Sequence, residues 1–327
     1  MINYILIIVG FAILMKGADF FVGSASKIAK RFGIPTIIIG LTIVSIGTSA
    51  PELSVSIISA LKGSADIAAG NVIGSNIFNL LVVIGVAALI KPIKINESIV
   101  KEDYPIMVGT GILLLVIISL TKLLAEANVT AIPRVGGVIL ITTVIIYTLR
   151  LIKQANKIIF SDDLLSETKT SEEDDNKSGN LIKEILIGLV GLVAVIWSGD
   201  LVVNNAVIVA KSLGMSDTLV GLTVIAIGTS LPELATSITA ALKGESDIAV
   251  GNVVGSNIFN VILILGATSL ITPIVFATKI VFDLMLYLII ALVVFIIIKK
   301  TKAVNKLLAS SMILTYIGYT VMAIIRN

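Results

Sequence analysis

The stretch Ser45-Ile46-Gly47-Thr48-Ser49-Ala50-Pro51-Glu52 places a glycine, a proline and a glutamate inside an apolar helical pattern. Proline has no N–H and its ring crowds the carbonyl four residues earlier, so we expect the helix to kink or unwind around Gly47 and to free one or two carbonyls. One helical face beside these carbonyls carries the residues spaced 0, 3, 4 and 7, namely Ser45, Thr48, Ser49 and Glu52. The stretch therefore predicts a strip of oxygen ligands.

The same stretch occurs again as Ala226 to Glu233, with Thr229, Ser230 and Pro232 in matching positions. The surrounding residues 40–79 and 221–260 align without a gap at an offset of 181, and by direct count 28 of the 40 positions are identical. The register continues back through Asp19 and Asp200 into the preceding helix of each copy. Such self-similarity predicts a chain built from two copies of one unit.

The helix that follows each stretch carries a second polar strip. It holds Ser75 and Asn79 in the first copy and Ser256 and Asn260 in the second, each pair four residues apart. Hydrogen bonding between helices is the alternative role for these side chains. We favour ion ligation because they adjoin the glutamate stretch in both copies. The glycines beside them form small-xxx-small faces, which favour close helix packing.

Composition places the chain in a membrane. Of the 327 residues, 57% are apolar and 14% are charged, against roughly 45–50% and ~25% in soluble domains. The apolar stretches have the length that a helix needs to cross a bilayer. The absence of cysteine and histidine excludes disulfides and thiolate or imidazole metal sites. Any metal must therefore be held by oxygen, which favours hard ions such as Ca²⁺, Mg²⁺ and Na⁺.

Apolar periodicity predicts an all-α integral membrane protein with ten transmembrane helices, of which the second and seventh are broken. We expect them near residues 3–26, 35–61, 67–90, 104–122, 131–153, 182–209, 216–242, 248–271, 278–298 and 305–325. Five helices per copy is an odd number, so the two copies should have inverted orientations in the membrane, as in many secondary transporters.

The polar, acidic stretch Ser161 to Gly179 lacks an apolar face and is interpreted as a flexible linker. This divides the chain into a first repeat at 1–155, an acidic linker at 156–181 and a second repeat at 182–327. A Ca²⁺-sensing role is the alternative for the linker, but its carboxylates lack the spacing of a hand-like calcium loop. Basic residues concentrate on the linker's side of the membrane, so the linker is predicted to be cytoplasmic and both termini extracellular.

Glu52 and Glu233 are the residues most indicative of function. A carboxylate near the bilayer centre is costly unless it is paired, and neither helix has a lysine or arginine near its glutamate. A bound cation is therefore favoured over a structural salt bridge. For Asp19 and Asp200, which lie toward the far ends of their helices, we favour a structural or helix-anchoring role over a place in the ion pathway.

These paired motifs resemble the alpha repeats of the cation/Ca²⁺ exchanger superfamily, most closely its Na⁺/Ca²⁺ exchanger branch. The resemblance covers nearly the whole chain outside the linker. It implies a central Ca²⁺ site flanked by Na⁺ sites, and helices 1 and 6 that slide across the others to switch access. The implied ligands are Ser45, Thr48, Ser49, Glu52, Ser75, Asn79, Ala226, Thr229, Ser230, Glu233, Ser256 and Asn260, with Ser45 and Ala226 contributing mainly backbone carbonyls.

The resemblance implies antiport of Na⁺ against Ca²⁺ across the cell membrane, with several Na⁺ exchanged per Ca²⁺. Some microbial relatives have aspartate where this chain has Asn260, so the expected site charge is −2 and transport should be electrogenic. K⁺-dependent relatives tend to have aspartate at the position of Asn79, so this residue disfavours K⁺ co-transport. Ca²⁺/H⁺ antiport with the same fold is the alternative; its family members carry Gly-Asn-x-x-Glu in place of Gly-Thr-Ser-x-Pro-Glu, and this favours Na⁺ coupling.

A passive cation channel is the competing class outside the exchangers, and an intramembrane enzyme is disfavoured because no nucleophile–base pair is visible. No cofactor is expected. The expected partners are the transported ions and the lipid bilayer. The formal charge of +3 is too small to indicate nucleic-acid binding, and the chain is expected to work as a monomer.

Overall fold

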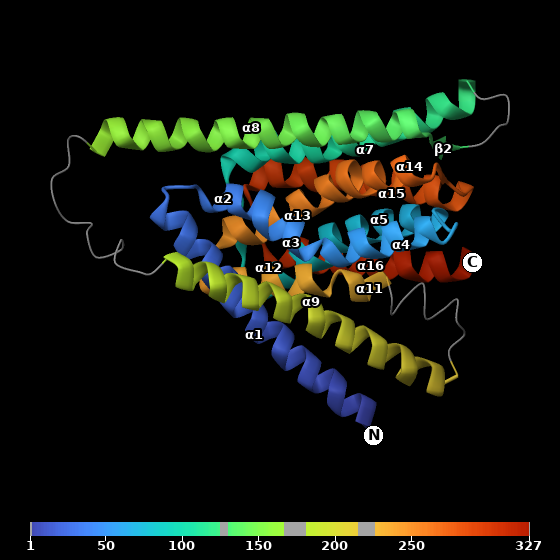
Figure 1. Cartoon of the computed structure of the whole chain (residues 1–327), viewed down its shortest axis with the longest axis horizontal. Helices are drawn as coiled ribbons and strands as arrows, with labels where there is room; N and C mark the ends of the chain where they lie inside the picture. The colour runs from blue at the N-terminus through green and yellow to red at the C-terminus, as the bar shows by residue number, and fades with distance from the viewer. Residues whose placement is uncertain (1, 125–129, 167–180, 215–225, 327) are drawn as a thin grey trace.

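The computed structural model describes residues 2–124, 130–166, 181–214 and 226–326, and it is a bundle of long helices (Figure 1). Within these residues, eight helices are long and apolar enough to cross a membrane. A bent pair at Thr36–Thr48 and Ala50–Leu61 makes a ninth if it is counted as one span. The seventh predicted helix, 216–242, falls partly outside the described residues. The prediction of an all-helical membrane protein is confirmed.

Six helices are continuous over most of their length. They are α1 (Ile2–Arg31), α7 (Tyr104–Leu124), α8 (Arg134–Ser166), α9 (Leu181–Ser212), α15 (Thr278–Thr301) and α16 (Lys306–Arg326). The structure departs from prediction at α8, which continues beyond 153 into the segment expected to be a flexible linker. Lysine, glutamine, alanine and leucine there have good helix propensity, and extending an existing helix is easier than nucleating one. Residues 167–180 of the predicted linker lie outside the described residues.

The repeated motifs lie on helices that change type along their length. In the first copy these are α2 (Thr36–Ile39), η1 (Gly40–Val44), α3 (Ser45–Thr48), α4 (Ala50–Leu61), α5 (Asp66–Phe78), η2 (Asn79–Val83) and α6 (Ile84–Ile90). In the second copy they are α11 (Ala226–Thr229), α12 (Leu231–Lys243), α13 (Ser246–Phe259), η6 (Asn260–Ile264) and α14 (Leu265–Ile271).

The η segments are π-helical, and the sequence did not indicate them. A further one, η3 (Ile99–Asp103), precedes α7. Asn79 and Asn260 are the first residues of η2 and η6. π-Helical turns inside α-helices are frequent at functional sites because they change the direction of the side chains that follow.

Two short antiparallel strand pairs join distant parts of the chain at the helix ends. β1 (Ile93–Lys94) pairs with β4 (Ala303–Val304), and β2 (Ala131–Ile132) pairs with β3 (Ile274–Val275). β1 and β3 are related by the 181-residue offset of the repeat. Each pair therefore links a segment of the first half to a segment of the second.

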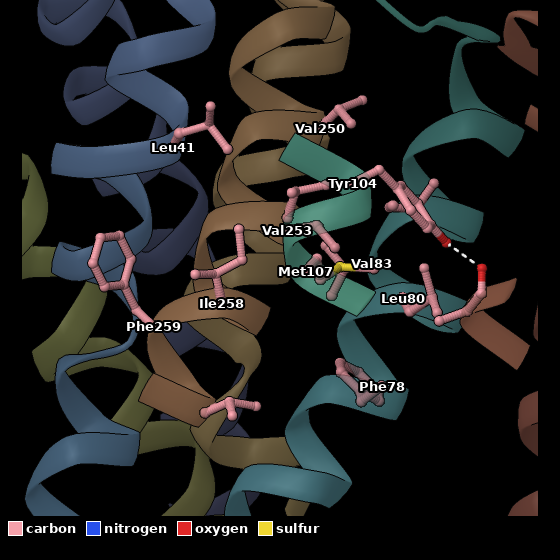
Figure 2. Close-up of a cluster of buried hydrophobic side chains, with 14 of the residues drawn as sticks. Leu41, Phe78, Leu80, Val83, Tyr104, Met107, Val250, Val253, Ile258 and Phe259 are labelled. Carbon is pink, nitrogen blue, oxygen red and sulfur yellow. Dashed lines mark hydrogen bonds between the residues drawn. The ribbon is translucent and has the colours of Figure 1, made fainter. Parts of the chain in front are cut away.

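The core of the bundle is formed around α13 and the α5–α6 helix. Buried side chains of α13 such as Val253 and Ile258 belong to one apolar cluster with Leu80 of η2 and Met107 of α7 (Figure 2). Tyr104 is fully buried in this cluster and its hydroxyl donates to the Ala291 carbonyl oxygen at 3.0 Å. By contrast, α16 exposes most of its surface, as expected for a lipid-facing helix.

Helices α1 and α9 form a closely packed pair that slants away from the other helices (Figure 1). Glycine allows them to cross closely, because a Cβ at Gly191 would lie 2.6 Å from the Phe21 backbone nitrogen. The pair meets the bundle through a separate apolar cluster from α1, α9 and α12, formed by Leu14, Ala18, Val195, Val202, Leu231 and Ala235. Only one of the two broken helices thus contributes to this cluster.

Candidate cation site

The first motif bends its helix at Ser49, where the segments Thr36–Thr48 and Ala50–Leu61 meet at 44°. Ser49 has φ −82° and ψ 9°, and Pro51 lies in the first turn of α4. The second copy turns in the same way at Ser230, with φ −91° and ψ 8°. The predicted break in this helix is therefore confirmed, and its centre lies at Ser49, two residues after Gly47. The proline removes the bond to the Gly47 carbonyl, but the backbone absorbs the strain nearer to the proline ring.

The two motif copies exchange serine hydrogen bonds. Ser49 Oγ donates to Glu233 Oε1 at 2.8 Å, and Ser230 Oγ donates to Glu52 Oε1 at 3.1 Å. Both carboxylates are fully buried. Each glutamate is therefore held by the serine that precedes the glutamate of the other copy, and the two carboxylates are brought to one place.

The second polar strip adds a serine to each carboxylate. Ser75 Oγ lies 3.4 Å from Glu52 Oε1, and Ser256 Oγ lies 3.4 Å from Glu233 Oε1. Ser256 Oγ is also 3.0 Å from Ser49 Oγ and 3.4 Å from the Ser45 carbonyl oxygen. This oxygen-rich cluster joins residues from α3, α4, α5, α12 and α13.

A pair of asparagines that the sequence analysis did not select holds the motifs in position. Asn71 Nδ2 donates to the Glu52 carbonyl oxygen, and Asn252 Nδ2 donates to that of Glu233, each at 3.3 Å. Their side-chain oxygens accept from the threonines of the opposite copy, Thr229 at 3.4 Å and Thr48 at 3.0 Å. Their recurrence at the 181-residue offset was the signal that could have identified them.

A second asparagine pair joins α5 to α13. Asn76 Nδ2 donates to the Asn257 carbonyl oxygen and Asn257 Nδ2 donates to that of Asn76, both at 3.1 Å. Here the two halves differ, because Asn260 Nδ2 donates to Asn76 Oδ1 at 3.0 Å, while the side chain of Asn79 makes no hydrogen bond among the described residues. Neither Asn76 nor Asn257 was selected from the sequence.

Several buried oxygens of this region have no hydrogen-bond donor among the residues described. They are Glu52 Oε2, Glu233 Oε2, Asn79 Oδ1, Asn257 Oδ1 and Asn260 Oδ1. Leaving buried acceptors unpaired is costly, and more so for a charged group. Carboxylate and amide oxygens are the ligands that hard cations prefer. This donor set therefore fits a hard cation held by two carboxylates and neutral oxygens.

The structure describes eleven of the twelve predicted ligand side chains, and all eleven are buried. Ala226 begins α11, but its side chain is outside the description. Ser45, Ser49, Glu52, Ser75, Ser230, Glu233 and Ser256 take part in the contacts around the carboxylates. The hydroxyls of Thr48 and Thr229 bond the asparagine pair, and Asn79 and Asn260 lie on the π-helical turns.

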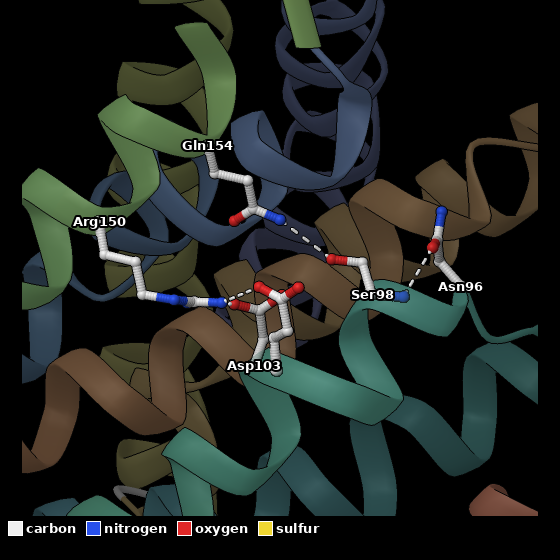
Figure 3. A network of polar contacts seen from close by, with 6 residues as sticks. Asn96, Ser98, Asp103, Arg150 and Gln154 are labelled. Atoms are coloured by element: carbon white, nitrogen blue, oxygen red, sulfur yellow. Dashed lines mark hydrogen bonds and ion pairs between the residues drawn. The ribbon is translucent and has the colours of Figure 1, made fainter. Parts of the chain in front are cut away.

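Several charged groups outside this cluster form ion pairs with one another. Arg150 of α8 binds Asp103 at 3.0 Å and also contacts Glu102 (Figure 3). Arg326 and Asp283 pair at 2.9 Å between α16 and α15. Within the described residues, no lysine or arginine forms an ion pair with either buried glutamate. These pairs join helices to one another and do not neutralise the candidate site.

Comparison with known sequences identifies the family. The sequence pattern of the family described as "Sodium/calcium exchanger protein" matches residues 2–153 and 183–325, which is most of the chain. The chain belongs to the sodium/calcium exchanger family. Its relatives include the inner membrane protein YrbG of Escherichia coli, which is 38% identical over 270 residues that cover 82% of this chain and 79% of YrbG.

Another family member is the sodium/calcium exchanger MaX1 of Methanosarcina acetivorans, 32% identical over 299 residues that cover 83% of this chain and 84% of MaX1. Among solved structures, the sodium-calcium exchanger NCX_Mj superposes with a TM-score of 0.79 over 96% of both chains at 26% identity. The resemblance stated from the motifs alone is thereby confirmed. The family is one of membrane exchangers, not of catalytic enzymes.

Proposed function

We propose that this exchanger carries Ca²⁺ out of the cell in antiport with Na⁺, by alternating access to a site between Glu52 and Glu233. One observation carries the proposal: each buried carboxylate accepts a hydrogen bond from the serine of the opposite motif copy and keeps its second oxygen unpaired. Two carboxylates neutralise one Ca²⁺, and the nearby amide and hydroxyl oxygens supply neutral ligands. MaX1 and NCX_Mj are both named as sodium/calcium exchangers, which supports the choice of ions.

Coupling to Na⁺ follows from the hydroxyl-rich composition of the site. The proposed ligands are the twelve residues implied by the motifs, Ser45, Thr48, Ser49, Glu52, Ser75, Asn79, Ala226, Thr229, Ser230, Glu233, Ser256 and Asn260. With both glutamates ionised the site has a charge of −2. It would be neutral with Ca²⁺ and would carry +1 with three Na⁺, so exchange should be electrogenic.

The proposed topology is ten helices in two inverted repeats, with the acidic linker in the cytoplasm and both termini outside. Three observations support it. The motif hydrogen bonds recur with both partners shifted by 181 residues. The start of α1 and the end of α16 lie toward the same end of the bundle (Figure 1). The basic residues concentrate on the side opposite to that end.

Transport by the purified protein in liposomes tests this proposal. An outward Na⁺ gradient should drive uptake of radioactive Ca²⁺, and replacing internal Na⁺ by K⁺ should stop it. A membrane potential set with valinomycin should change the rate in the direction that +1 movement with Na⁺ requires. Uptake that follows only a pH gradient would replace the proposal by Ca²⁺/H⁺ antiport. Ca²⁺ flux that needs no counter-ion would indicate a channel.

A further inference from the structure

Charged residues join α1 to one end of α12, and no matching contact joins α9 to α4 among the described residues. Lys243, the last residue of α12, lies 2.8 Å from Asp19 Oδ1 and donates to the Asp19 carbonyl oxygen at 2.6 Å. Gly23 makes room for this ammonium, because a Cβ there would lie 2.8 Å from Lys243 Nζ. The end of α12 is thus bound to α1 by an ion pair and a hydrogen bond.

The repeat relates these residues to a second pair. At the 181-residue offset, Asp19 corresponds to Asp200 on α9, and Lys243 corresponds to Lys62, which follows α4. Lys62 and Asp200 are both exposed. Neither has an ion-pair partner within the part of the chain that the structure describes. One pair of residues is therefore joined while the copy of that pair is apart.

The two lysines lie at opposite ends of the bundle. The α5–α6 helix runs from Ile67 to Ile90 as one span. Lys62 lies just before the start of this span. Lys243 lies near its other end, because the neighbouring Gly244 is close to Lys91: a Cβ at Gly244 would be 3.3 Å from Lys91 Nζ. A movement that separates α1 from the end of α12 and brings α9 toward the end of α4 would exchange one contact for the other.

We propose that Lys243–Asp19 and Lys62–Asp200 are alternating ion pairs, each formed in one of the two access states of the exchanger. This inference rests on the proposed alternating-access function. In the structure described here, the first pair closes the Lys243 end. When α1 and α9 shift together to open that end, Lys243–Asp19 breaks and Lys62–Asp200 forms. Asn204 replaces Gly23 in the second copy, and its side-chain oxygen can also accept from Lys62.

The exchange of pairs is not symmetric in strength. Glu245, two residues after Lys243, accepts from Ser26 at 2.5 Å and from Lys30 at 3.2 Å on α1. Its counterpart in the first copy is Ser64, which cannot form an ion pair. The Lys243 end therefore has two charged contacts with α1 where the Lys62 end has one with α9. This difference favours the conformation seen here.

Cross-linking tests the pairs, because the natural chain has no cysteine. Two double variants, Asp19→Cys with Lys243→Cys and Asp200→Cys with Lys62→Cys, are treated with a short bifunctional thiol reagent in liposomes. We expect the first to cross-link readily and the second to cross-link only in the fraction that adopts the other state. Adding Lys243→Gln to the second variant removes the Lys243–Asp19 ion pair. This should raise the cross-linking rate by about two- to fivefold, the change expected for the loss of one exposed ion pair. Asp19→Cys with Lys62→Cys is the control that should not react.

Charge exchange provides the second test. Lys62→Asp alone and Asp200→Lys alone should each slow Ca²⁺ exchange, and the double variant should recover the rate, which loss of a merely structural residue would not allow. Absence of any Lys62–Asp200 cross-link in protein that actively exchanges ions would overturn the inference, as would failure of the double variant to recover. If both pairs cross-link in protein that does not transport Ca²⁺, the alternation of the ion pairs would stand and the proposed function would be rejected.

Discussion

The broken helices α4 and α12 carry the same motif but have different surroundings. Ile58 of α4 is 50% exposed, while its counterpart Thr239 on α12 is 5% exposed. Ser54 is exposed, whereas its counterpart Ala235 is buried in the cluster that α1 and α9 form with α12. The difference arises because α1 lies along α12 and α9 does not lie along α4. These two segments are identical at 7 of the 12 matching positions in 50–61 and 231–242, and they differ in burial because the helix pair covers only α12.

The largest effect should come from what α4 and α12 share. Glu52→Gln and Glu233→Gln should each reduce Ca²⁺ exchange by on the order of 100-fold or more, because breaking a buried charge pair costs about 3–5 kcal/mol. Equal losses in the two variants would show that the site is shared although the two helices are covered differently. Radioactive Ca²⁺ uptake into liposomes measures the effect.

Glu97→Gln is the matched control. Glu97 lies in the short helical segment directly before η3, where the nearby Lys101 and Lys302 hold the pKa of its carboxyl below the usual range. It is exposed and remote from the motifs, so this variant should transport normally. Normal exchange by either Glu52→Gln or Glu233→Gln would contradict a shared site.

The next effect depends on the different burial of α12 and α4. Ala235→Leu should lower the free energy of unfolding by about 1–3 kcal/mol, because the larger side chain has no space between α12 and α1. Ser54→Leu, at the matching exposed position of α4, should change it by less than about 0.5 kcal/mol. Thermal unfolding in detergent compares the two. Equal destabilisation would mean that α4 is covered as α12 is.

A smaller effect is expected at Thr236, a position of α12 that carries a hydroxyl where α4 has an apolar residue. Thr236 is fully buried and its Oγ1 has no hydrogen-bond partner among the described residues, and the matching residue is Val55. Thr236→Val should raise the free energy of unfolding by about 1 kcal/mol, since an unpaired buried hydroxyl is removed without changing the shape. The same thermal measurement applies. A loss of stability would show that the hydroxyl has a partner in solution.

The smallest effect concerns the charged contact between α1 and the end of α12. Glu245→Gln weakens the bonds from Ser26 and Lys30, and an exposed ion pair contributes roughly 0.2–1 kcal/mol. Hydrogen exchange followed by mass spectrometry should show faster exchange in the last turns of α1. Because Ser64 of the first copy makes no such contact, Ser64→Ala should leave exchange in α9 unchanged.

Much of the candidate site was predictable because its chemistry is local. Composition and helix length placed the chain in a membrane, and the proline, the hydroxyls and the glutamates of each motif lie within about two helical turns. The roles of Asn71 and Asn252 were not predictable in this way. Their partners are threonines of the other copy, and nothing in either segment alone shows which residues of the other copy it will contact.

The amino-acid sequence by itself determined the internal duplication, the membrane character of the chain and the proline break, and it restricted any metal ligand to oxygen. These depend on residue type and on spacing along one helix, which act over short distances. Tertiary structure alone decided the exchanged serine bonds, the π-helical turns at Asn79 and Asn260, and the covering of α12 in preference to α4. The physical reason is that both copies carry the same motif, so the motif itself does not select which copy α1 covers. The choice between them depends on a few contacts, such as those of Lys243 and Glu245, made by residues far apart in the chain.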